Sequence, residues 1–339
     1  MKVLLGMSGG FDSTFAALKL KEMGYDVEGA TLVMHAYTDT AQAESAAVRL
    51  GIPLHIIDCR TRFSEIVENN FIEEYKNGRT PNPCIICNRE VKFKVLLDYA
   101  LSHGFDMIAT GHYARVSRVG ERYTLLPPRD KDKDQSYMLS RLTQDELSHL
   151  LLPLSDEVKR DLRERVKRED LPIADSKDSQ EICFIPEGKY YDYLEKYLGE
   201  AKEGDFIDND GNVLGRHRGI VNYTVGQRKG LGIALGHRVF VSKIDVENNT
   251  VTLSGEGDCK HTVDLRDVVY MGINEPDDSV TLDVNVKIRY RARPVSAAAT
   301  LHKDGSLTLE FSEPVRSASP GQTAVLYVND AVIASGFIQ

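Results

Sequence analysis

The stretch Leu4-Leu5-Gly6-Met7-Ser8-Gly9-Gly10-Phe11-Asp12-Ser13-Thr14 decides the fold of this 339-residue chain. A short apolar run leads into a Ser-Gly-Gly turn, and an Ala- and Leu-rich segment that ends at Gly24 follows. This order predicts a β-strand, a phosphate-binding loop and a helix. Glycines allow backbone amides to approach an anion at the positive end of the helix dipole. We therefore expect Gly6 through Ser13 to bind a nucleotide.

Asp12 is the unusual residue of this loop, because a carboxylate repels phosphate unless a cation lies between them. A Mg²⁺-bound pyrophosphate group would remove that conflict. The loop lacks the Gly-Lys-Ser/Thr ending of a Walker loop and the third glycine of a dinucleotide-binding motif. It resembles the Ser-Gly-Gly-x-Asp-Ser loop of the ATP pyrophosphatases, which adenylate a substrate and release pyrophosphate. The alternative interpretation is a glycine-rich turn with an Asx cap.

The composition is that of an ordinary soluble protein with two or three domains, at 42% hydrophobic and 27% charged residues. Five irregularly placed cysteines argue against a secreted disulfide scaffold, so we expect a reducing, cytoplasmic environment. No apolar run approaches the roughly 20 residues that span a bilayer, which predicts no membrane association. The net charge of −9 means that a nucleic-acid partner would need a local basic patch.

Strands and helices alternate after the first helix. Strands are predicted at Val27–Val33 and Pro53–Asp58, and helices at Thr40–Leu50 and Phe63–Lys76. This alternation predicts a parallel sheet with helices on both faces, which binds ligands at the carboxyl ends of its strands. Met34 and Gly111 follow predicted strands and are candidates for contacting adenine. Met34 as simple core packing is the alternative.

Gly78 through Phe93, which includes Thr-Pro-Asn-Pro-Cys-Ile-Ile-Cys, predicts an extended loop followed by a helix from Asn88 to Tyr99. The thiols of Cys84 and Cys87 would lie at the helix start. There the helix dipole and Arg79, Arg89 and Lys92 are expected to lower their pKa, as suits a nucleophile. A zinc site and a redox pair are the alternatives, but no second cysteine pair has ligand spacing.

Several polar segments are candidates for RNA contact. Gly111–Arg115 and Lys131–Tyr137 carry amide, cationic and aromatic side chains that can hold an unstacked base. A basic helix is predicted over Ser155–Asp170, and Lys287, Arg289, Arg291 and Arg293 alternate as if on one face of a strand. Solvated charged surfaces are the alternative in each case.

The chain becomes β-rich past about Tyr197. Turn residues at Asp208–Asn212 separate two short strands, and Val239–Asp245 with Thr250–Ser254 predicts a hairpin. A further all-β stretch runs from about Val268 to the end. Upstream of these, Asp178–Pro186 holds the single thiol of Cys183 in a loop-like segment, with buried packing as the alternative.

Taken together, five segments resemble the tRNA-specific 2-thiouridylases, the MnmA/TrmU family: Ser8–Ser13, Gly78–Phe93, Gly111–Arg115, Asp178–Pro186 and Tyr223–Leu231. The resemblance implies ATP-dependent 2-thiolation of the wobble uridine (U34) of tRNA, in which O2 is adenylated and sulfur comes from an enzyme-bound cysteine persulfide. It also implies an ATP-pyrophosphatase domain with a tRNA-contacting helical segment at residues 1–197, a small central β-rich domain at 198–262 and a β-barrel at 263–339.

The resemblance also implies roles for individual residues. Cys183 would carry the persulfide and Cys87 would be the partner nucleophile, which releases sulfide or forms a disulfide with Cys183. ATP and Mg²⁺ would be the cofactors, with Met34 and Gly111 contacting ATP. Asn82, Pro83 and Cys84 would lie against the target base, and tRNA would also contact His112, Lys133, Asp134, Gln135, Arg289, Tyr290 and Gln322. The implied partners are tRNA and a persulfide donor, either a cysteine desulfurase or a relay protein.

Cys84 departs from the family pattern, because many members have Asp at this position, proposed there as an acid/base group. With Cys84, Cys87 and Cys183 the chain has three candidate thiols, the ligand count of a [4Fe-4S] cluster that could hold the sulfur instead. Two alternatives of other kinds are a non-thiolating ATP-pyrophosphatase ligase and a nucleotide-sensing or RNA-binding module.

Overall fold

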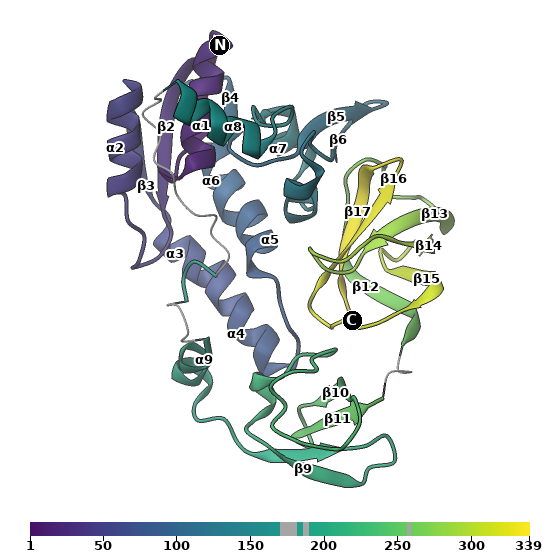
Figure 1. Cartoon of the computed structure of the whole chain (residues 1–339). Helices are drawn as coiled ribbons and strands as arrows, with labels where there is room; N and C mark the ends of the chain where they lie inside the picture. Colours follow the sequence, from purple (N-terminus) through teal and green to yellow (C-terminus); the bar gives the residue numbers. More distant parts are fainter. Residues whose placement is uncertain (170–181, 186–189, 256–258) are drawn as a thin grey trace.

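A computed structural model of the chain describes residues 1–169, 182–185, 190–255 and 259–339. Its strands form an N-terminal sheet covered by helices, a hairpin, a small central sheet and a closed barrel (Figure 1). Of the segment Asp178–Pro186 that the sequence singles out, the structure describes only residues 182–185.

The N-terminal sheet is parallel, with strand order β3-β2-β1-β4-β7. The strands are β1 (Lys2–Gly6), β2 (Asp26–Val33), β3 (Leu54–Asp58), β4 (Met107–Thr110) and β7 (Leu150–Leu151). Val3 and Leu5 of β1 pack in one core with α1 (Phe11–Glu22), α2 (Ala41–Leu50) and α8 (Lys159–Arg168). Leu4 packs on the other side with α6 (Lys94–Ser102). The predicted α/β sheet with helices on both faces is confirmed.

Two long helical segments lie between β3 and β4, and each contains a π-helical turn. The first joins α3 (Arg60–Phe63), η1 (Ser64–Glu68) and α4 (Asn69–Lys76); the second joins α5 (Pro83–Cys87), η2 (Asn88–Phe93) and α6. The predicted start of the second helix at Asn88 is wrong. The helix begins five residues earlier because the Asn82 side chain accepts a hydrogen bond from the Cys84 amide, and proline fits the first turn.

A hairpin and short helices connect β4 to α8 and pack against the barrel. They are β5 (Arg115–Val119), β6 (Arg122–Leu126), the 3₁₀ turns η3 (Lys131–Lys133) and η4 (Ser136–Leu139), and α7 (Gln144–Ser148). The Thr124 hydroxyl donates to the Val332 carbonyl at 2.6 Å. Helix α8 begins at Lys159, four residues after the predicted start at Ser155.

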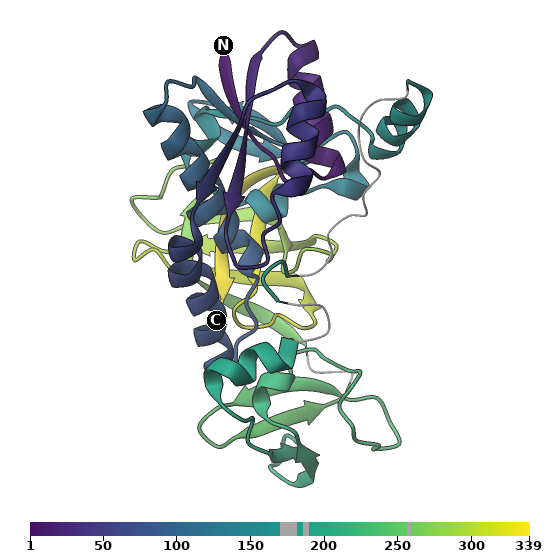
Figure 2. The same cartoon turned by 90° about the vertical axis from the view of Figure 1, so that its left-hand side faces the viewer.

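The central sheet has strand order β10-β11-β8-β9 and lies at the opposite end of the molecule from the N-terminal sheet (Figure 2). Its elements are β8 (Gly204–Ile207), β9 (Val213–His217), the 3₁₀ turn η5 (Ile220–Asn222), β10 (Phe240–Asp245) and β11 (Thr250–Ser254), preceded by α9 (Tyr190–Leu198). The predicted β10–β11 hairpin is confirmed by its antiparallel register.

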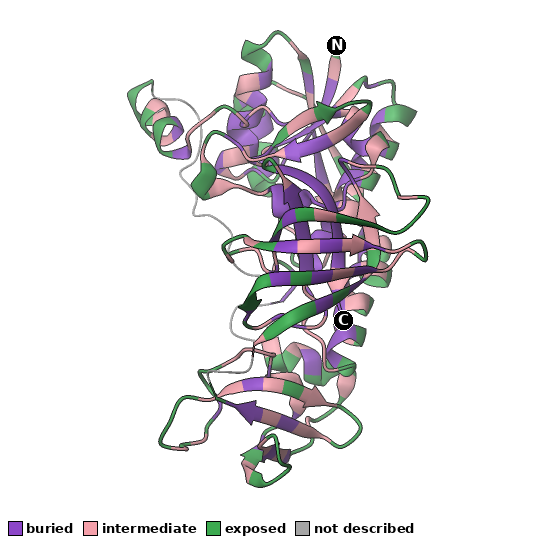
Figure 3. Cartoon of the chain, turned by 90° about the vertical axis from the view of Figure 1, so that its right-hand side faces the viewer, coloured by how far each residue is buried: buried purple, intermediate pink, exposed green. Residues whose placement is uncertain are grey.

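Six strands close the barrel in the order β12-β15-β14-β13-β16-β17. They are β12 (Lys260–Tyr270), β13 (Val280–Lys287), β14 (Val295–Leu301), β15 (Leu307–Val315), β16 (Thr323–Val328) and β17 (Ala331–Ile338). Along β14, buried residues alternate with more exposed ones, whereas β16 and β17 are buried along most of their length (Figure 3).

The predicted basic strand face is wrong. Strand β13 ends at Lys287, and a turn in which the Ala292 amide donates to the Arg289 carbonyl carries the chain to β14. Arg289 and Arg291 therefore lie in the loop between β13 and β14, where a strict alternation of faces no longer applies.

Candidate nucleotide and thiol site

One large cavity lies where the carboxyl ends of the N-terminal strands meet the barrel. Its volume is about 1310 Å³. The phosphate loop, the ends of β2 and β4, the helix that starts at Pro83, the segment 131–135, Lys159 and the β13–β14 loop all contribute to its wall. It is the crevice that the parallel sheet predicts, extended by residues from the distant barrel.

The phosphate loop contributes Gly6, Met7, Ser8, Asp12 and Ser13 to the cavity. The Ser8 amide donates to the Ser13 hydroxyl at 3.2 Å, which in turn donates to the Gly10 carbonyl at 3.1 Å. The N-cap of helix α1 is Gly10, which has no side chain, so the positive end of the helix dipole faces the loop without a capping side chain of that residue.

Gly9 of the loop is also required for packing against α2. Gly9 has φ +76°, and a Cβ there would lie 2.3 Å from the backbone carbon of Gln42 in α2. Within the described residues, the cavity lining does not include Gly9, Gly10 or Phe11. Phe11 is buried against Phe15 and the Arg163 guanidinium, so its side chain points away from the cavity.

Asp12 is held by two side chains that the sequence did not single out. The Lys159 ammonium donates to Asp12 Oδ2 at 2.6 Å, and the Tyr113 hydroxyl donates to Oδ1 at 3.0 Å. Lys159 is the first residue of α8 and is 5% exposed, which shows that a buried cation faces the phosphate loop. Asp12 and Lys159 are 147 positions apart in the sequence. The only sequence signal was a lysine at the start of a basic helix.

Met34 and Gly111 line the cavity as expected. A Cβ on Gly111 would lie 2.8 Å from the Asp12 backbone carbon, so only glycine lets the end of β4 approach the start of α1. The Met34 amide donates to the Thr38 hydroxyl at 3.3 Å, and the Met34 sulfur lies 3.9 Å from the Cys87 sulfur. Met34 thus lies between the sheet end and the thiol-bearing helix.

The thiols of Cys84 and Cys87 lie in different environments. Cys84 is half-buried, lines the cavity and follows the Asn82 cap. Cys87 is 4% exposed. Burial raises the pKa of Cys87 to about 12, although the Lys92 ammonium opposes this. The expectation of a lowered pKa is wrong for Cys87, because Arg79 pairs with Glu74 and Arg89 with Glu90.

Cys183 is exposed, and its neighbours anchor it beside the same helix. Phe184 packs edge-on against Phe63 and Phe71 at 5.4 and 5.5 Å, in one core with Cys87. Surrounding protein raises the pKa of the Cys183 thiol, and Lys92 again opposes the shift. Lys92 therefore acts electrostatically on Cys84, Cys87 and Cys183 together. All of these cysteines are free thiols.

The structure was also searched for metal sites. Among the residues that the structure describes, no group of three or more His, Cys, Asp or Glu side chains is placed to hold a metal ion. Asp12 is a different case, because Mg²⁺ bound to a nucleotide needs only one or two carboxylates besides the phosphates.

The expected base and tRNA residues lie on the walls of the cavity. Its lining includes Cys84, His112, Lys133, Asp134, Gln135, Arg289, Tyr290 and Gln322, whereas Asn82 and Pro83 lie at the start of α5 beside it. Burial, with the Lys92 charge, lowers the pKa of His112 to about 3, so its imidazole is neutral at physiological pH. Gln135 is fixed by the Tyr113 amide, which donates to its Oε1 at 2.8 Å.

The barrel residues of this wall already have protein partners. Arg289 donates to the Val225 carbonyl at 2.8 Å and to the Ser319 hydroxyl. Gln322 Nε2 donates to the Thr80 carbonyl at 2.7 Å. These contacts join the barrel to the central sheet and to the loop before Cys84.

The fold and the cavity define a nucleotide-binding enzyme of the HUP class with two appended β-domains. Three domain families match in this order: "tRNA methyl transferase HUP domain" over residues 1–187, "tRNA methyl transferase PRC-barrel domain" over 191–255, and "Aminomethyltransferase beta-barrel domain" over 260–338.

Full-length relatives specify the family. The chain is 42% identical to the tRNA-specific 2-thiouridylase MnmA of Acetivibrio thermocellus and 40% identical to that of Clostridium acetobutylicum, covering 100% of this chain and 99% of each relative. The chain belongs to this family of tRNA sulfurtransferases. A crystal structure of a predicted subunit of tRNA methyltransferase from Methanocaldococcus jannaschii aligns with a TM-score of 0.35 and 22% identity, over 49% of this chain and 76% of that one.

Within the described part of the chain, none of the helices has the length and apolar character that crossing a membrane requires.

Proposed function

We propose that this chain catalyses the ATP-dependent 2-thiolation of the wobble uridine, U34, of tRNA in the cytoplasm, by adenylating O2 and transferring sulfur from a cysteine persulfide. One observation supports this above others. A single cavity is lined both by the phosphate loop and by Cys84, so a nucleotide and a target base can meet there. A ligase that acts without thiols would not need the three cysteines grouped around Lys92.

The first step activates a poor leaving group. Uridine O2 attacks the α-phosphorus of ATP, the bond to the β-phosphate oxygen breaks, and pyrophosphate leaves. The N-terminus of α1 and the Ser8 and Ser13 hydroxyls are suited to bind the phosphates, and Lys159 can neutralise charge on the leaving pyrophosphate. Asp12 would hold Mg²⁺, which adds positive charge at the same group.

The second step replaces oxygen with sulfur. The terminal sulfur of the Cys183 persulfide attacks C2, and AMP leaves with the former O2. The Cys87 thiolate then attacks the Cys183 sulfur, forming a Cys87–Cys183 disulfide and leaving 2-thiouridine, so that a reductant must restore both thiols. The persulfide itself comes from a cysteine desulfurase or a relay protein. A [4Fe-4S] cluster held by Cys84, Cys87 and Cys183 that carries the sulfur is the alternative to the persulfide route.

The remaining residues would hold the tRNA. Asn82, Pro83 and Cys84 are proposed to contact the flipped base, with His112 as a neutral hydrogen-bonding group. Lys133, Asp134 and Gln135 on one wall and Arg289, Tyr290 and Gln322 on the other are proposed to contact the surrounding nucleotides. The same proposal divides the chain into a catalytic domain at residues 1–197, a central domain at 198–262 and a barrel domain at 263–339.

The test is a single-turnover reaction of persulfide-loaded protein with ATP, Mg²⁺ and unmodified tRNA, in which 2-thiouridine at position 34 is measured by mass spectrometry. Cys183→Ala is expected to abolish product, and Cys87→Ala to block it unless free sulfide is supplied. Cys259→Ala is the matched control, because Cys259 is half-buried and lies outside the cavity.

The reaction is run with and without oxygen. Product from Cys183→Ala at the wild-type rate would refute the persulfide route. Activity that disappears in air and in all three of Cys84→Ala, Cys87→Ala and Cys183→Ala would favour a cluster. Pyrophosphate release without thiolated tRNA would favour a ligase of another kind.

A further inference from the structure

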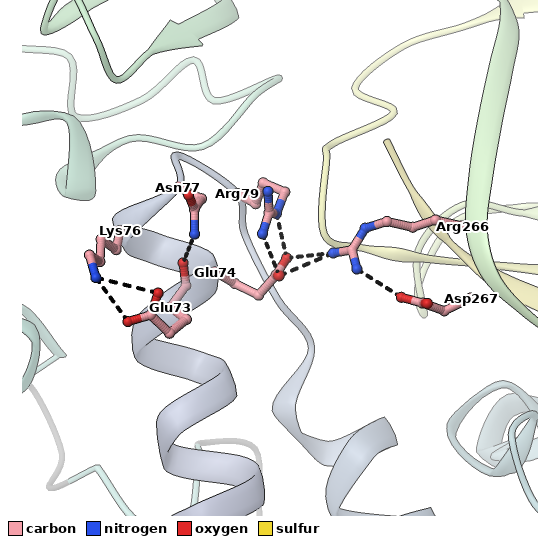
Figure 4. Close-up of polar contacts among 7 residues, drawn as sticks. All are labelled: Glu73, Glu74, Lys76, Asn77, Arg79, Arg266 and Asp267. Atoms are coloured by element: carbon pink, nitrogen blue, oxygen red, sulfur yellow. Dashed lines mark hydrogen bonds and ion pairs between the residues drawn. The ribbon is translucent and has the colours of Figure 1, made fainter.

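Glu74, near the end of α4, accepts hydrogen bonds from two arginines that belong to different parts of the molecule (Figure 4). Arg79 donates from Nε and Nη2 at 2.8 and 2.7 Å. Arg266, on barrel strand β12, donates from Nη2 to both carboxylate oxygens at 3.1 Å. The Arg79 and Arg266 side chains are 32% and 35% exposed, whereas the Glu74 side chain is only 9% exposed.

This arrangement is more specific than a surface ion pair. Burial alone would raise the pKa of Glu74, but the two guanidinium groups lower it overall, so the carboxylate stays ionised. A buried carboxylate that loses a partner is left with unsatisfied charge, and bidentate arginine contacts fix direction as well as distance. The Glu74 cluster, defined as Glu74, Arg79 and Arg266, therefore holds its three elements in one relative position.

The Glu74 cluster is close in sequence to the thiol-bearing loop. Arg79 precedes Cys84 by five positions, and Thr80, which lies between them, contacts the barrel. The Thr80 amide donates to the Pro320 carbonyl at 2.8 Å, and its carbonyl accepts from Gln322 at 2.7 Å. A rigid path thus runs from strand β12 through Glu74 and the loop to the start of α5.

This path joins the two domains that supply the walls of the cavity. Cys84 lines it from the N-terminal domain, and Arg289, Tyr290 and Gln322 line it from the barrel. Any change in the position of the barrel relative to α4 would therefore change the separation between the thiols and the RNA-facing loop.

The structure assigns to Glu74 and Arg266 the role of positioning residues for sulfur transfer. They fix the thiol-bearing loop against the barrel, so that tRNA bound to the barrel presents its base at Cys84. Neither residue lines the cavity, so neither is expected to affect nucleotide binding. This inference rests on the proposed function, because it concerns the sulfur-transfer step of that reaction.

The test compares neighbouring glutamates of the same helix. Glu74→Gln is compared with Glu73→Gln, because Glu73 pairs with Lys76 of its own helix and both of those side chains are about 60% exposed. Arg266→Met removes the barrel contact, and Arg266→Lys keeps the charge but lacks the planar guanidinium that reaches Glu74 through Nη2 and Asp267 through Nη1. The full-length proteins are measured for the ATP dissociation constant, the single-turnover rate of 2-thiouridine formation and melting temperature.

Glu74→Gln and Arg266→Met are expected to slow sulfur transfer by about tenfold to a hundredfold, since a shift of about 1 Å in a reacting group has effects of that size. The ATP dissociation constant should stay within about twofold, and Arg266→Lys should recover part of the rate. A purely structural role would instead lower the melting temperature and reduce ATP binding and transfer together. That result, or a Glu74→Gln variant that behaves like Glu73→Gln, overturns the inference.

A second readout does not depend on catalysis. Alkylation of Cys84 by iodoacetamide is measured relative to Cys259 in the same molecule, and Glu74→Gln is expected to change this ratio by about threefold or more as the loop loosens. An unchanged ratio contradicts the positioning role. If wild-type protein makes no 2-thiouridine, the proposed function fails, and the alkylation ratio still tests whether Glu74 positions the loop.

Discussion

The contact between Lys159 and Asp12 places a buried ammonium group beside the phosphate loop, where the proposed reaction would release pyrophosphate. Replacing it by an uncharged side chain of similar length removes that charge and leaves Asp12, within the described residues, the hydrogen bond from Tyr113. We expect Lys159→Met to slow pyrophosphate release by about a hundredfold, the usual effect of losing one preorganised electrostatic contact. The rate is measured at saturating ATP, Mg²⁺ and tRNA.

Lys19→Met is the control for this prediction. Lys19 lies on α1 and pairs with Glu157 at 2.6 Å, so it joins the start of α8 to α1 without lining the cavity. The substitution removes the same charge from the same helix interface. Equal losses in Lys19→Met and Lys159→Met would mean that the lysine serves only to attach α8.

The thiol of Cys87 gives a prediction about pH. Because its pKa is raised to about 12, the thiolate is a small fraction at neutral pH and increases about tenfold for each pH unit below that value. The rate of disulfide formation with a Cys183 persulfide should therefore rise continuously from pH 7 to pH 10. Stopped-flow or quenched single turnovers measure it.

Lys92→Met is the companion variant, since the ammonium opposes the pKa rise of Cys87. The substitution should lower the rate at every pH and leave the slope unchanged. A plateau near pH 8 in the wild type would show that the reacting thiol ionises far more easily than its burial implies. His112 should contribute no inflection near pH 6.5, because its pKa is lowered to about 3.

At the scale of elements, the loop from Gly78 to Pro83 depends on a glycine in the barrel. Gly321 has φ +88°, and a Cβ there would lie 3.0 Å from Glu74 Oε2 and 3.1 Å from the Thr80 amide nitrogen. Gly321→Ala should therefore destabilise the protein by about 1–3 kcal/mol through backbone strain, and also displace the loop. Denaturant unfolding measures the first effect, and 2-thiouridine formation measures the second.

Gly305→Ala separates the two causes. Gly305 lies in a barrel turn with φ +81°, and a Cβ there would meet nothing within 4 Å. It should show the strain alone, with thiolation unchanged. If both variants lose thiolation to the same extent, the loop does not depend on its contact with Gly321.

The helices and strands that are determined by residues close together in the sequence were predictable from it. Strand β1, the phosphate loop and α1, as well as the β10–β11 hairpin, follow from local patterns of apolar residues and turns. The start of α5 was predicted wrongly, because the two prolines indicated an extended loop, whereas Asn82 is the N-cap and Pro83 is the first residue of the helix. Alternating basic residues after Lys287 suggested a strand, but they occupy a turn.

The partners of buried charges could not be predicted, because they come from distant parts of the chain. Nothing near Asp12 in sequence indicates Lys159, and nothing near Glu74 indicates Arg266, which is 192 positions away. The same holds for thiol reactivity. Cys87 lies in a helix rich in cations, yet pairing of Arg79 and Arg89 with glutamates and burial of the sulfur reverse the expected pKa shift.

At the scale of the whole molecule, the N-terminal domain and the barrel share a hydrophobic core. Met271, Val325 and Val332 of the barrel pack in one cluster with Leu4 and Leu96 of the N-terminal domain. The barrel and the central sheet also have cores of their own. The shared core explains how a cavity can use both domains as walls, since the walls are held together by apolar packing and by the Glu74 cluster.

The charge distribution predicts how tRNA binding responds to salt. The chain carries a net charge of −9, so we expect affinity for RNA to depend on a local group of cations, and Lys131, Lys133, Lys287 and Arg291 line the cavity. Binding should weaken steeply as salt rises, because phosphate contacts release counterions. Lys287→Ala should reduce the slope of log affinity against log salt by about 0.7–0.9 if Lys287 contacts one phosphate.

Lys303→Ala is the control, because Lys303 pairs with Asp278 on an exposed part of the barrel outside the cavity. Fluorescence anisotropy with unmodified tRNA at several salt concentrations measures both, and equal slopes for the two variants would place the tRNA on another face.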